Sequence, residues 1–390
     1  MTAEVTSIVP QRAAARRRER KTHGTARIAI FFLVPVATLL IVGLGSILSS
    51  SSVVALRETG DSLFYFKRQL GWAAAGVLVL LVASRIPLRW YARLAFPVFL
   101  LAVVGLVAVL VAGEARYGAT RWLAVGPISI QPSEFAKLAT ILLLATVVSR
   151  REQVAQGLGD LFWPVVIAVG VIGGLIMMQP DLGTTLLVGV GAFAILFAST
   201  APLYSVLVSA GVATGVALAL ARSSPYRWVR ITSFLDPLGD PLGSGFQATQ
   251  SLVALGTGGW FGVGLGASRA RWSFLPNAHT DFIFSILGEE TGLTGSLAVV
   301  ALFVAFTVAG TVVAYRASDR FGRLLAIGIT VWLGVQALVN IGGVVGVLPV
   351  TGAPLPFVSF GGSALLTEMA AVGILVSVCR NGSRAAEAAT

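Results

Sequence analysis

Ten apolar segments, separated by shorter polar stretches, constrain the fold of this chain more than any other feature of its sequence. Most are about 16 to 25 residues long, close to the length that a helix needs to cross a bilayer. They cover residues 28–50, 69–84, 94–112, 134–149, 162–178, 184–199, 203–221, 283–314, 324–348 and 361–379. The sequence therefore predicts an all-α polytopic membrane protein, with about ten transmembrane helices in one membrane domain over residues 28–379.

The amino-acid composition supports this class and excludes others. Hydrophobic residues make up 56% of the 390 residues and charged residues only 12%, so a soluble fold could not cover the apolar surface. The single cysteine, Cys379, can form no intramolecular disulfide bond. No cluster of Cys and His residues has the spacing of a metal site, so the sequence predicts no resident metal.

A basic region precedes the first apolar segment. Residues 1–27 contain seven of the 28 Lys and Arg residues, and the formal net charge of the chain is +11. In a soluble protein this charge would suggest a nucleic-acid partner, but beside a membrane segment it suits anionic lipid headgroups. We expect residues 1–27 to be a disordered cytoplasmic tail, with membrane lipids as partners and no nucleic acid.

The distribution of Lys and Arg residues also predicts the orientation. A cytoplasmic N-terminus places Arg85, Arg89, Arg93, Arg150 and Arg151 in short inner loops, where positive charge is favoured. Ten crossings would put both termini in the cytoplasm, with residues 380–390 as a short C-terminal tail. The loops rich in Pro and Gly then lie on the outer face, and the largest, residues 222–282, joins the seventh and eighth segments.

The segment 283–314 is too long for one simple crossing. Its first turns contain Glu289, Glu290 and Gly292, which are unusual in a membrane-spanning helix. Irregular or charged backbone at membrane depth occurs where it is buried in protein or lines a cavity. We expect this stretch to be partly exposed or re-entrant.

An aspartate lies just before that segment, in the stretch from Leu275 to Phe284. A carboxylate at a membrane boundary costs free energy unless it is paired or functional, so Asp281 is a candidate site residue. His279, one of two histidines in the chain, lies two positions earlier. A simpler interpretation is that Asp281 caps the helix that begins at Phe282.

Two other outer motifs share the order Gln-Pro followed by an acidic residue. In the first, which begins at Gln131, Glu134 lies three positions before Lys137, so the two can pair on one helix face. A capped helix with a surface ion pair would also explain this pattern. In the second, Asp181 follows Gln179-Pro180 and can cap the sixth helix.

Three further features of the outer loops carry potential chemistry. Arg121, next to a tryptophan, is either an interfacial anchor or part of a site. Residues 256–266 are dense in glycine and could bring backbone N–H groups close to a phosphate. The stretch 348–363 has three prolines and three glycines, which exclude a helix, and it ends at Ser363, a candidate cap. In the helix that follows, Glu368 is expected to be a buried carboxylate that is hydrogen-bonded within the bundle.

Together these motifs resemble those of the SEDS family (shape, elongation, division and sporulation), over nearly everything after the tail. The matching segments are Arg121-Trp122 with Gln131-Pro132-Ser133-Glu134 and Lys137, Gln179-Pro180-Asp181-Leu182-Gly183-Thr184, His279-Thr280-Asp281-Phe282, and Pro349-Val350-Thr351-Gly352 through Ser359 to Ser363. The early outer loop and Trp272–Asn277 are more similar to the division branch, FtsW, than to the elongation branch, RodA. Asn277 departs from the family pattern, since many relatives have an acid there.

The resemblance implies a peptidoglycan glycosyltransferase with the SEDS fold in the bacterial cytoplasmic membrane, at the division septum. Its substrate would be lipid II. Its partners would be a class B penicillin-binding protein, which is a transpeptidase, and other divisome proteins. Two other functions stay open: a lipid II flippase, which needs charges at mid-membrane depth, and a non-catalytic scaffold for the transpeptidase.

Glycosyl transfer with inversion requires a general base at the attacking hydroxyl and positive charge at the departing undecaprenyl pyrophosphate. By the resemblance, Asp281 is the general base, and Arg121 and Lys137 stabilise the pyrophosphate. Arg68, Arg227 or a divalent cation, Mg²⁺ or Mn²⁺, would assist them. The other expected substrate contacts are Gln131, Glu134, Asp181, His279, Thr280, Ser359 and Ser363.

Overall fold

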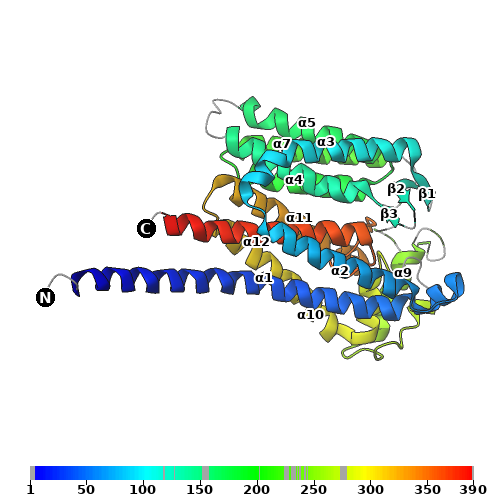
Figure 1. Cartoon of the computed structure of the whole chain (residues 1–390). Helices are drawn as coiled ribbons and strands as arrows, with labels where there is room; N and C mark the ends of the chain where they lie inside the picture. Colours follow the sequence, from blue (N-terminus) through cyan, green and yellow to red (C-terminus); the bar gives the residue numbers. More distant parts are fainter. Residues whose placement is uncertain are drawn as a thin grey trace.

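Each of the ten apolar segments is helical in the computed structural model (Figure 1). The helices are α1 (Val5–Thr59), α2 (Phe64–Arg85), α3 (Leu88–Ala112), α4 (Pro132–Arg151), α5 (Leu158–Met177), α6 (Leu182–Phe197), α7 (Leu203–Arg222), α10 (Ile283–Arg316), α11 (Arg320–Val344) and α12 (Gly362–Ala388). The structure describes residues 5–388 except 117–118, 127, 152–157, 202, 224–227, 230–233, 235, 237–238, 241–242, 244 and 273–278.

The lengths of the helices confirm the membrane class. Within the described ranges, seven helices are long and apolar enough to cross a membrane, namely α1, α2, α3, α4, α10, α11 and α12. Shorter apolar stretches occupy α5 and α6. The predicted polytopic helical membrane protein is therefore confirmed.

Three helices, α4, α11 and α12, form the centre of the bundle. In the most apolar stretch of 18 residues in α4, 83% of the residues are buried inside the protein, against 28% in the corresponding stretch of α3. The outer helix α3 exposes Leu101 and Val111, as expected where lipid tails cover apolar side chains. α4 and α12 both contact α11, and α12 also packs along α2. Polar side chains on these central helices are thus held inside the protein.

The N-terminal region differs from the prediction. α1 begins at Val5, so most of the region 1–27, for which the sequence predicted a disordered cytoplasmic tail, is helical in this structure, and its cytoplasmic place stays a prediction. Residues 13–21 are all Ala, Arg, Glu or Lys, which are strong helix formers. They extend the apolar helix that follows and need no separate nucleation. α1 also continues to Thr59, which shortens the connection to α2 to residues 60–63.

A small antiparallel sheet makes the all-α prediction incomplete. Its strands pair in the order β1 (Glu114–Arg116), β2 (Ala119–Val125) and β3 (Ile128–Ile130). Trp122 and Ile130 favour strands, and Gly126 has a φ of 62° in the turn between β2 and β3. The sheet gives Arg121 a fixed place on β2.

The long connection before α10 contains a further helix, α9 (Phe246–Gly258), and a 3-10 turn, Ala270–Trp272. α10 itself is broken at Gly292, where φ is 68° and ψ is −165°. A Cβ atom at Gly292 would lie 2.4 Å from the backbone nitrogen of Gly262, so the close approach requires glycine. The break lies within the stretch that the sequence predicted to be partly exposed or re-entrant, and the re-entrant path stays a prediction.

The expected exposure of Glu289 and Glu290 is wrong, since these residues are only 3% and 4% exposed. The carboxylate of Glu289 accepts hydrogen bonds from the backbone N–H groups of Arg269 (3.1 Å) and Ala270 (3.3 Å). The carboxylate of Glu290 accepts a hydrogen bond from the Ser49 hydroxyl. These donors compensate for the loss of water. Arg269 and Ala270 tie the loop before α10 to the helix itself, and Ser49 ties α1 to it.

Both ends of the chain lie at the same end of the bundle, and the sheet and α9 lie at the opposite end (Figure 1). An even number of crossings requires the two ends of the chain to lie on the same side of the membrane. Since the candidate Arg121 lies on the sheet, the other candidate site residues are sought at the same end of the bundle.

Candidate active site

Asp281 lies in the turn that leads into α10. The N-cap residue of α10 is Phe282, one position after Asp281, and the Phe282 side chain makes no capping hydrogen bond. The alternative that Asp281 is the cap of this helix is therefore wrong. The side chain is half-buried, so it keeps contact with the outside of the protein.

Three consecutive backbone carbonyls in this turn each accept a hydrogen bond from another part of the chain. The carbonyl of His279 accepts from the backbone N–H of Phe360 at 3.0 Å. The carbonyl of Thr280 accepts from the Ser359 hydroxyl at 2.6 Å. The carbonyl of Asp281 accepts from the Asn340 amide at 2.9 Å. The backbone that carries Asp281 is thus fixed to the loop before α12 and to α11.

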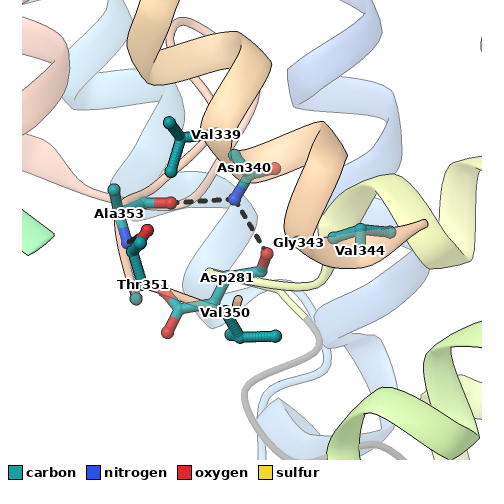
Figure 2. Close-up of a pocket in the computed structure, with 9 residues that line it drawn as sticks. Asp281, Val339, Asn340, Gly343, Val344, Val350, Thr351 and Ala353 are labelled. Carbon is teal, nitrogen blue, oxygen red and sulfur yellow. Dashed lines mark hydrogen bonds between the residues drawn. The ribbon is translucent and has the colours of Figure 1, made fainter. Parts of the chain in front are cut away.

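Asp281 also lines a hollow between α11 and the loop before α12 (Figure 2). The lining residues are Asp281, Val339, Asn340, Gly343, Val344, Val350, Thr351, Gly352 and Ala353. The walls are mostly apolar or backbone, so a charge here interacts strongly with any polar group that enters. Such a setting suits a general base that must act on one hydroxyl group.

The turn before α6 brings Arg121 and Asp181 together. The Arg121 guanidinium lies 3.7 Å from the Asp181 carboxylate and donates hydrogen bonds to the carbonyls of Gln179, at 3.2 Å, and Pro180. Asp181 also accepts hydrogen bonds from the Thr184 N–H (3.1 Å) and hydroxyl (2.9 Å), so its predicted role as the cap of α6 is confirmed.

This turn is next to the Asp281 hollow. A Cβ atom at Gly183 would lie 2.6 Å from the carbonyl oxygen of Thr351, so the start of α6 is in close contact with the hollow wall. Thr351 lines the hollow together with Asp281. The motif around Gln179-Pro180-Asp181 and the stretch around Asp281, far apart in the sequence, therefore meet at one place.

Lys137 forms the expected ion pair, but inside the protein. Its Nζ lies 2.8 Å from the Glu134 carboxylate, and both side chains are almost fully buried. It also donates a 3.0 Å hydrogen bond to Gln336 and lies 5.1 Å from the centre of the Trp332 ring. The surface setting weighed for this pair is wrong, because α4 is central. The contact of Lys137 with pyrophosphate stays a prediction.

Gln336 links this pair to the loop before α12. Its amide nitrogen donates to the carbonyl of Pro354 at 3.0 Å and to the Glu368 carboxylate at 3.4 Å. The Glu368 carboxylate also accepts from the Phe357 N–H at 2.9 Å. The prediction that Glu368 is a buried, hydrogen-bonded carboxylate is confirmed. A continuous polar network thus runs from α4 through α11 to the loop before α12 and to Glu368 on α12.

His279 packs in an aromatic cluster. Its ring centre lies 5.0 Å from that of Tyr65 and 5.7 Å from that of Phe360. Burial lowers the pKa of His279, and the charge of Glu58 partly opposes this shift. The imidazole therefore favours its neutral form.

The remaining candidates have varied positions. The Ser363 hydroxyl accepts a hydrogen bond from the Gln131 N–H at 3.3 Å. Since α12 begins at Gly362, Ser363 is not its cap, and that prediction is wrong. Arg68 is half-buried in α2, and Arg227 lies outside the described residues. Within the part of the chain that the structure describes, no group of three His, Cys, Asp or Glu side chains could hold a metal ion.

Sequence reasoning missed Gln336 and Asn340. Both are almost fully buried on α11, at 0% and 5% exposure. Polar amides within an apolar segment are a visible signal, because each needs a partner when buried. Their partners could not be read from the sequence, since they lie on several other elements: α4, the turn before α10 and the loop before α12.

Comparisons with known proteins agree with the motifs. The sequence matches the family described as "Cell cycle protein" (FTSW_RODA_SPOVE) over residues 29–384. A protein of Coxiella burnetii named "Probable peptidoglycan glycosyltransferase FtsW" is 38% identical over 353 residues, covering 89% of this chain and 95% of the relative. "Stage V sporulation protein E" of Bacillus subtilis is 41% identical over 360 residues, covering 89% of this chain and 96% of the relative.

Solved structures show the same fold. One belongs to work described as "Structural coordination of polymerization and crosslinking by a peptidoglycan synthase complex", with a TM-score of 0.76, 29% identity and coverage of 90% of this chain and 97% of that chain. The other is the "Rod shape determining protein RodA" of Thermus thermophilus, with a TM-score of 0.66, 27% identity and coverage of 90% and 96%.

Proposed function

Because this chain belongs to the cell cycle protein family of FtsW, RodA and stage V sporulation protein E, we propose that it is a peptidoglycan glycosyltransferase that polymerises lipid II during cell division. The chain is an integral membrane protein by its family and its apolar helices. Its place in the cell would be the division septum.

One observation supports this proposal most strongly. Asp281 lines an apolar hollow, while its backbone is fixed by the hydrogen bonds of Asn340, Ser359 and Phe360 to three consecutive carbonyls. A general base works when its carboxylate is held within hydrogen-bonding distance of the reacting hydroxyl.

In the proposed reaction, the hydroxyl oxygen of one sugar attacks the anomeric carbon of another. The bond from that carbon to the pyrophosphate oxygen breaks, and undecaprenyl pyrophosphate leaves with the electron pair. The Asp281 carboxylate takes the proton of the attacking hydroxyl. One displacement inverts the configuration, so an α-linked donor gives a β-1,4 bond.

Positive charge must stabilise the departing pyrophosphate. Arg121 is the best-placed candidate. It binds the turn before α6, and this turn contacts the wall of the Asp281 hollow through Gly183 and Thr351. Lys137 would contribute through the buried network. Mg²⁺ or Mn²⁺ would assist if the pyrophosphate itself binds the cation, and chelation with EDTA tests this point.

The proposed partner is a class B penicillin-binding protein, a transpeptidase that would cross-link the new strands, together with other divisome proteins. The likeness to a chain of a solved peptidoglycan synthase complex supports it. Co-purification of the two proteins from a membrane extract, with a resident transporter as the negative control, tests the partnership.

The activity is tested with the purified chain in complex with its transpeptidase and with lipid II as substrate. Moenomycin is present to silence unrelated glycosyltransferases. We expect glycan strands from the wild type and a loss of about 10²-fold or more in Asp281→Asn, which keeps the shape of the side chain. Full activity in a folded Asp281→Asn variant would overturn the assignment of the base.

A second assay separates the alternatives. Fluorescent lipid II in vesicles reports transfer across the bilayer independently of polymerisation. Transfer without polymer would favour a flippase. If the wild type, still bound to the transpeptidase, shows neither activity, a scaffold is favoured.

A further inference from the structure

Asn340 joins the candidate base to the loop before α12. Its side-chain nitrogen donates one hydrogen bond to the carbonyl of Asp281 at 2.9 Å and another to the carbonyl of Ala353 at 2.8 Å (Figure 2). Asp281 and Ala353 both line the hollow. One amide group thus holds two walls of the hollow at a fixed separation.

The orientation of this amide is set by its neighbours. Two carbonyl oxygens converge on the side-chain nitrogen, and the reverse orientation would bring three oxygens together. The Oδ1 atom of Asn340 is then buried and has no hydrogen-bond partner among the residues that the structure describes. A buried acceptor without a partner costs free energy, so stability alone does not explain an asparagine here.

The spacing along α11 supports the same conclusion. Trp332, Gln336 and Asn340 are four residues apart and share one face of the helix. Gln336 donates to the carbonyl of Pro354 at 3.0 Å, next to the Ala353 carbonyl that Asn340 holds. Two amides one turn apart therefore fix consecutive carbonyls of the loop, and Asn340 extends this arrangement to Asp281.

We propose that Asn340 is a positioning residue for Asp281: its amide fixes the Asp281 backbone, and so the direction of the carboxylate in the hollow. This inference rests on the proposed role of Asp281 as general base. A small displacement of a catalytic group lowers the rate of the chemical step, because proton transfer depends steeply on geometry. Binding of the lipid-linked substrate elsewhere on the protein does not depend on this amide.

The first test replaces the amide by an apolar group of similar size. In Asn340→Leu, bound to the transpeptidase, we expect kcat for lipid II polymerisation to fall about 10- to 100-fold, with KM changed less than twofold. The matched control is Leu338→Ala, two residues away on α11 but 63% exposed and outside the hollow. The control is expected to keep wild-type kinetics.

The second test replaces the amide by a carboxyl group of the same shape. In Asn340→Asp the introduced group can donate one hydrogen bond when protonated, but none when ionised, and it then repels the two carbonyls. Position 340 is buried, and burial raises the pKa of a carboxyl from its usual value of about 4. The ratio of variant to wild-type activity should therefore fall as pH rises from about 5.5 to 8.5, while the introduced carboxyl ionises. A defect of packing alone would give a constant ratio.

Asp281→Asn is measured in parallel to separate the two levels of the proposal. If Asp281→Asn is inactive while folded Asn340→Leu keeps full kcat, the positioning role is overturned and the proposed function stands. If Asp281→Asn is fully active, the general base itself is overturned. If Asn340→Leu does not fold, as judged by gel filtration of the complex, the pH profile of Asn340→Asp decides, and a constant ratio overturns the positioning role.

Discussion

The guanidinium of Arg121 and the carboxylate of Asp181 lie 3.7 Å apart, although Arg121 is on β2 and Asp181 is in the turn before α6, far along the sequence. Arg121 also donates to the carbonyls of Gln179 and Pro180. The sheet is thereby fastened to the start of α6, and through Gly183 and Thr351 to the hollow that Asp281 lines. A cation is thus held, by geometry as well as by charge, at the turn that contacts the wall of the Asp281 hollow.

The first prediction separates geometry from charge at this position. Arg121→Lys keeps a positive charge but cannot make the three contacts of the planar guanidinium. We expect kcat/KM to fall about tenfold in Arg121→Lys and about a hundredfold or more in Arg121→Ala. Arg93→Lys is the control, because Arg93 is exposed and lies near the start of α3, far from the sheet. Its kcat/KM should equal that of the wild type. Equal activity in Arg121→Lys and the wild type would contradict the role of the contacts.

The second prediction concerns the buried ion pair of Lys137 and Glu134. Removing the cation in Lys137→Met leaves the Glu134 carboxylate without its 2.8 Å partner in a region of low dielectric. The expected loss is about 3–5 kcal/mol in the free energy of unfolding. Chemical denaturation in detergent measures this loss.

The companion experiment to this second prediction is a double-mutant cycle. In Lys137→Met with Glu134→Gln, neither residue carries a charge, so the double variant should regain at least half of the lost stability. Additive losses in the double variant would show that the two charges do not depend on each other. Activity measured on the double variant then reports whether the Lys137 charge also serves the pyrophosphate.

The third prediction concerns the break in α10. Gly292 has a φ of 68°, and an added Cβ atom would meet backbone atoms of residues 260–262 within 2.4 to 2.6 Å. Gly292→Ala should therefore lower the melting temperature by several degrees. Gly174→Ala, in α5, is the control, because an added Cβ atom meets nothing within 4 Å there and alanine favours helices. A melting temperature of Gly292→Ala at or above that of Gly174→Ala would contradict the argument.

Local patterns predicted much of this structure, since they depend on residues close in the sequence. The cap formed by Asp181 and the pairing of Glu134 with Lys137 follow from spacings of three residues, and both are confirmed. The burial of that pair depends on α4 being central, which no local pattern reveals. The hydrogen bond from Asn340 to Asp281 joins residues on different elements, so it becomes visible only when α11 and the turn before α10 are packed.

The fourth prediction concerns pH and His279. Burial lowers the pKa of His279 from its ordinary value of 6.5, with Glu58 partly opposing. Where pH lies between the folded and unfolded pKa values, the unfolded chain binds more protons, so stability rises with pH there. The contribution of His279 is thus complete above about pH 6.5 and is lost as pH falls through the lower, folded value.

The variant that isolates this effect is His279→Phe, which keeps an aromatic ring between Tyr65 and Phe360 but does not titrate. Other groups also titrate between pH 7.5 and 5.5, so the informative quantity is the difference between the two proteins. We expect the melting temperature of the wild type to fall more over this range than that of the variant. Equal decreases would mean that His279 is as easily protonated in the fold as in the unfolded chain, and the aromatic cluster would then not exclude the charged imidazole.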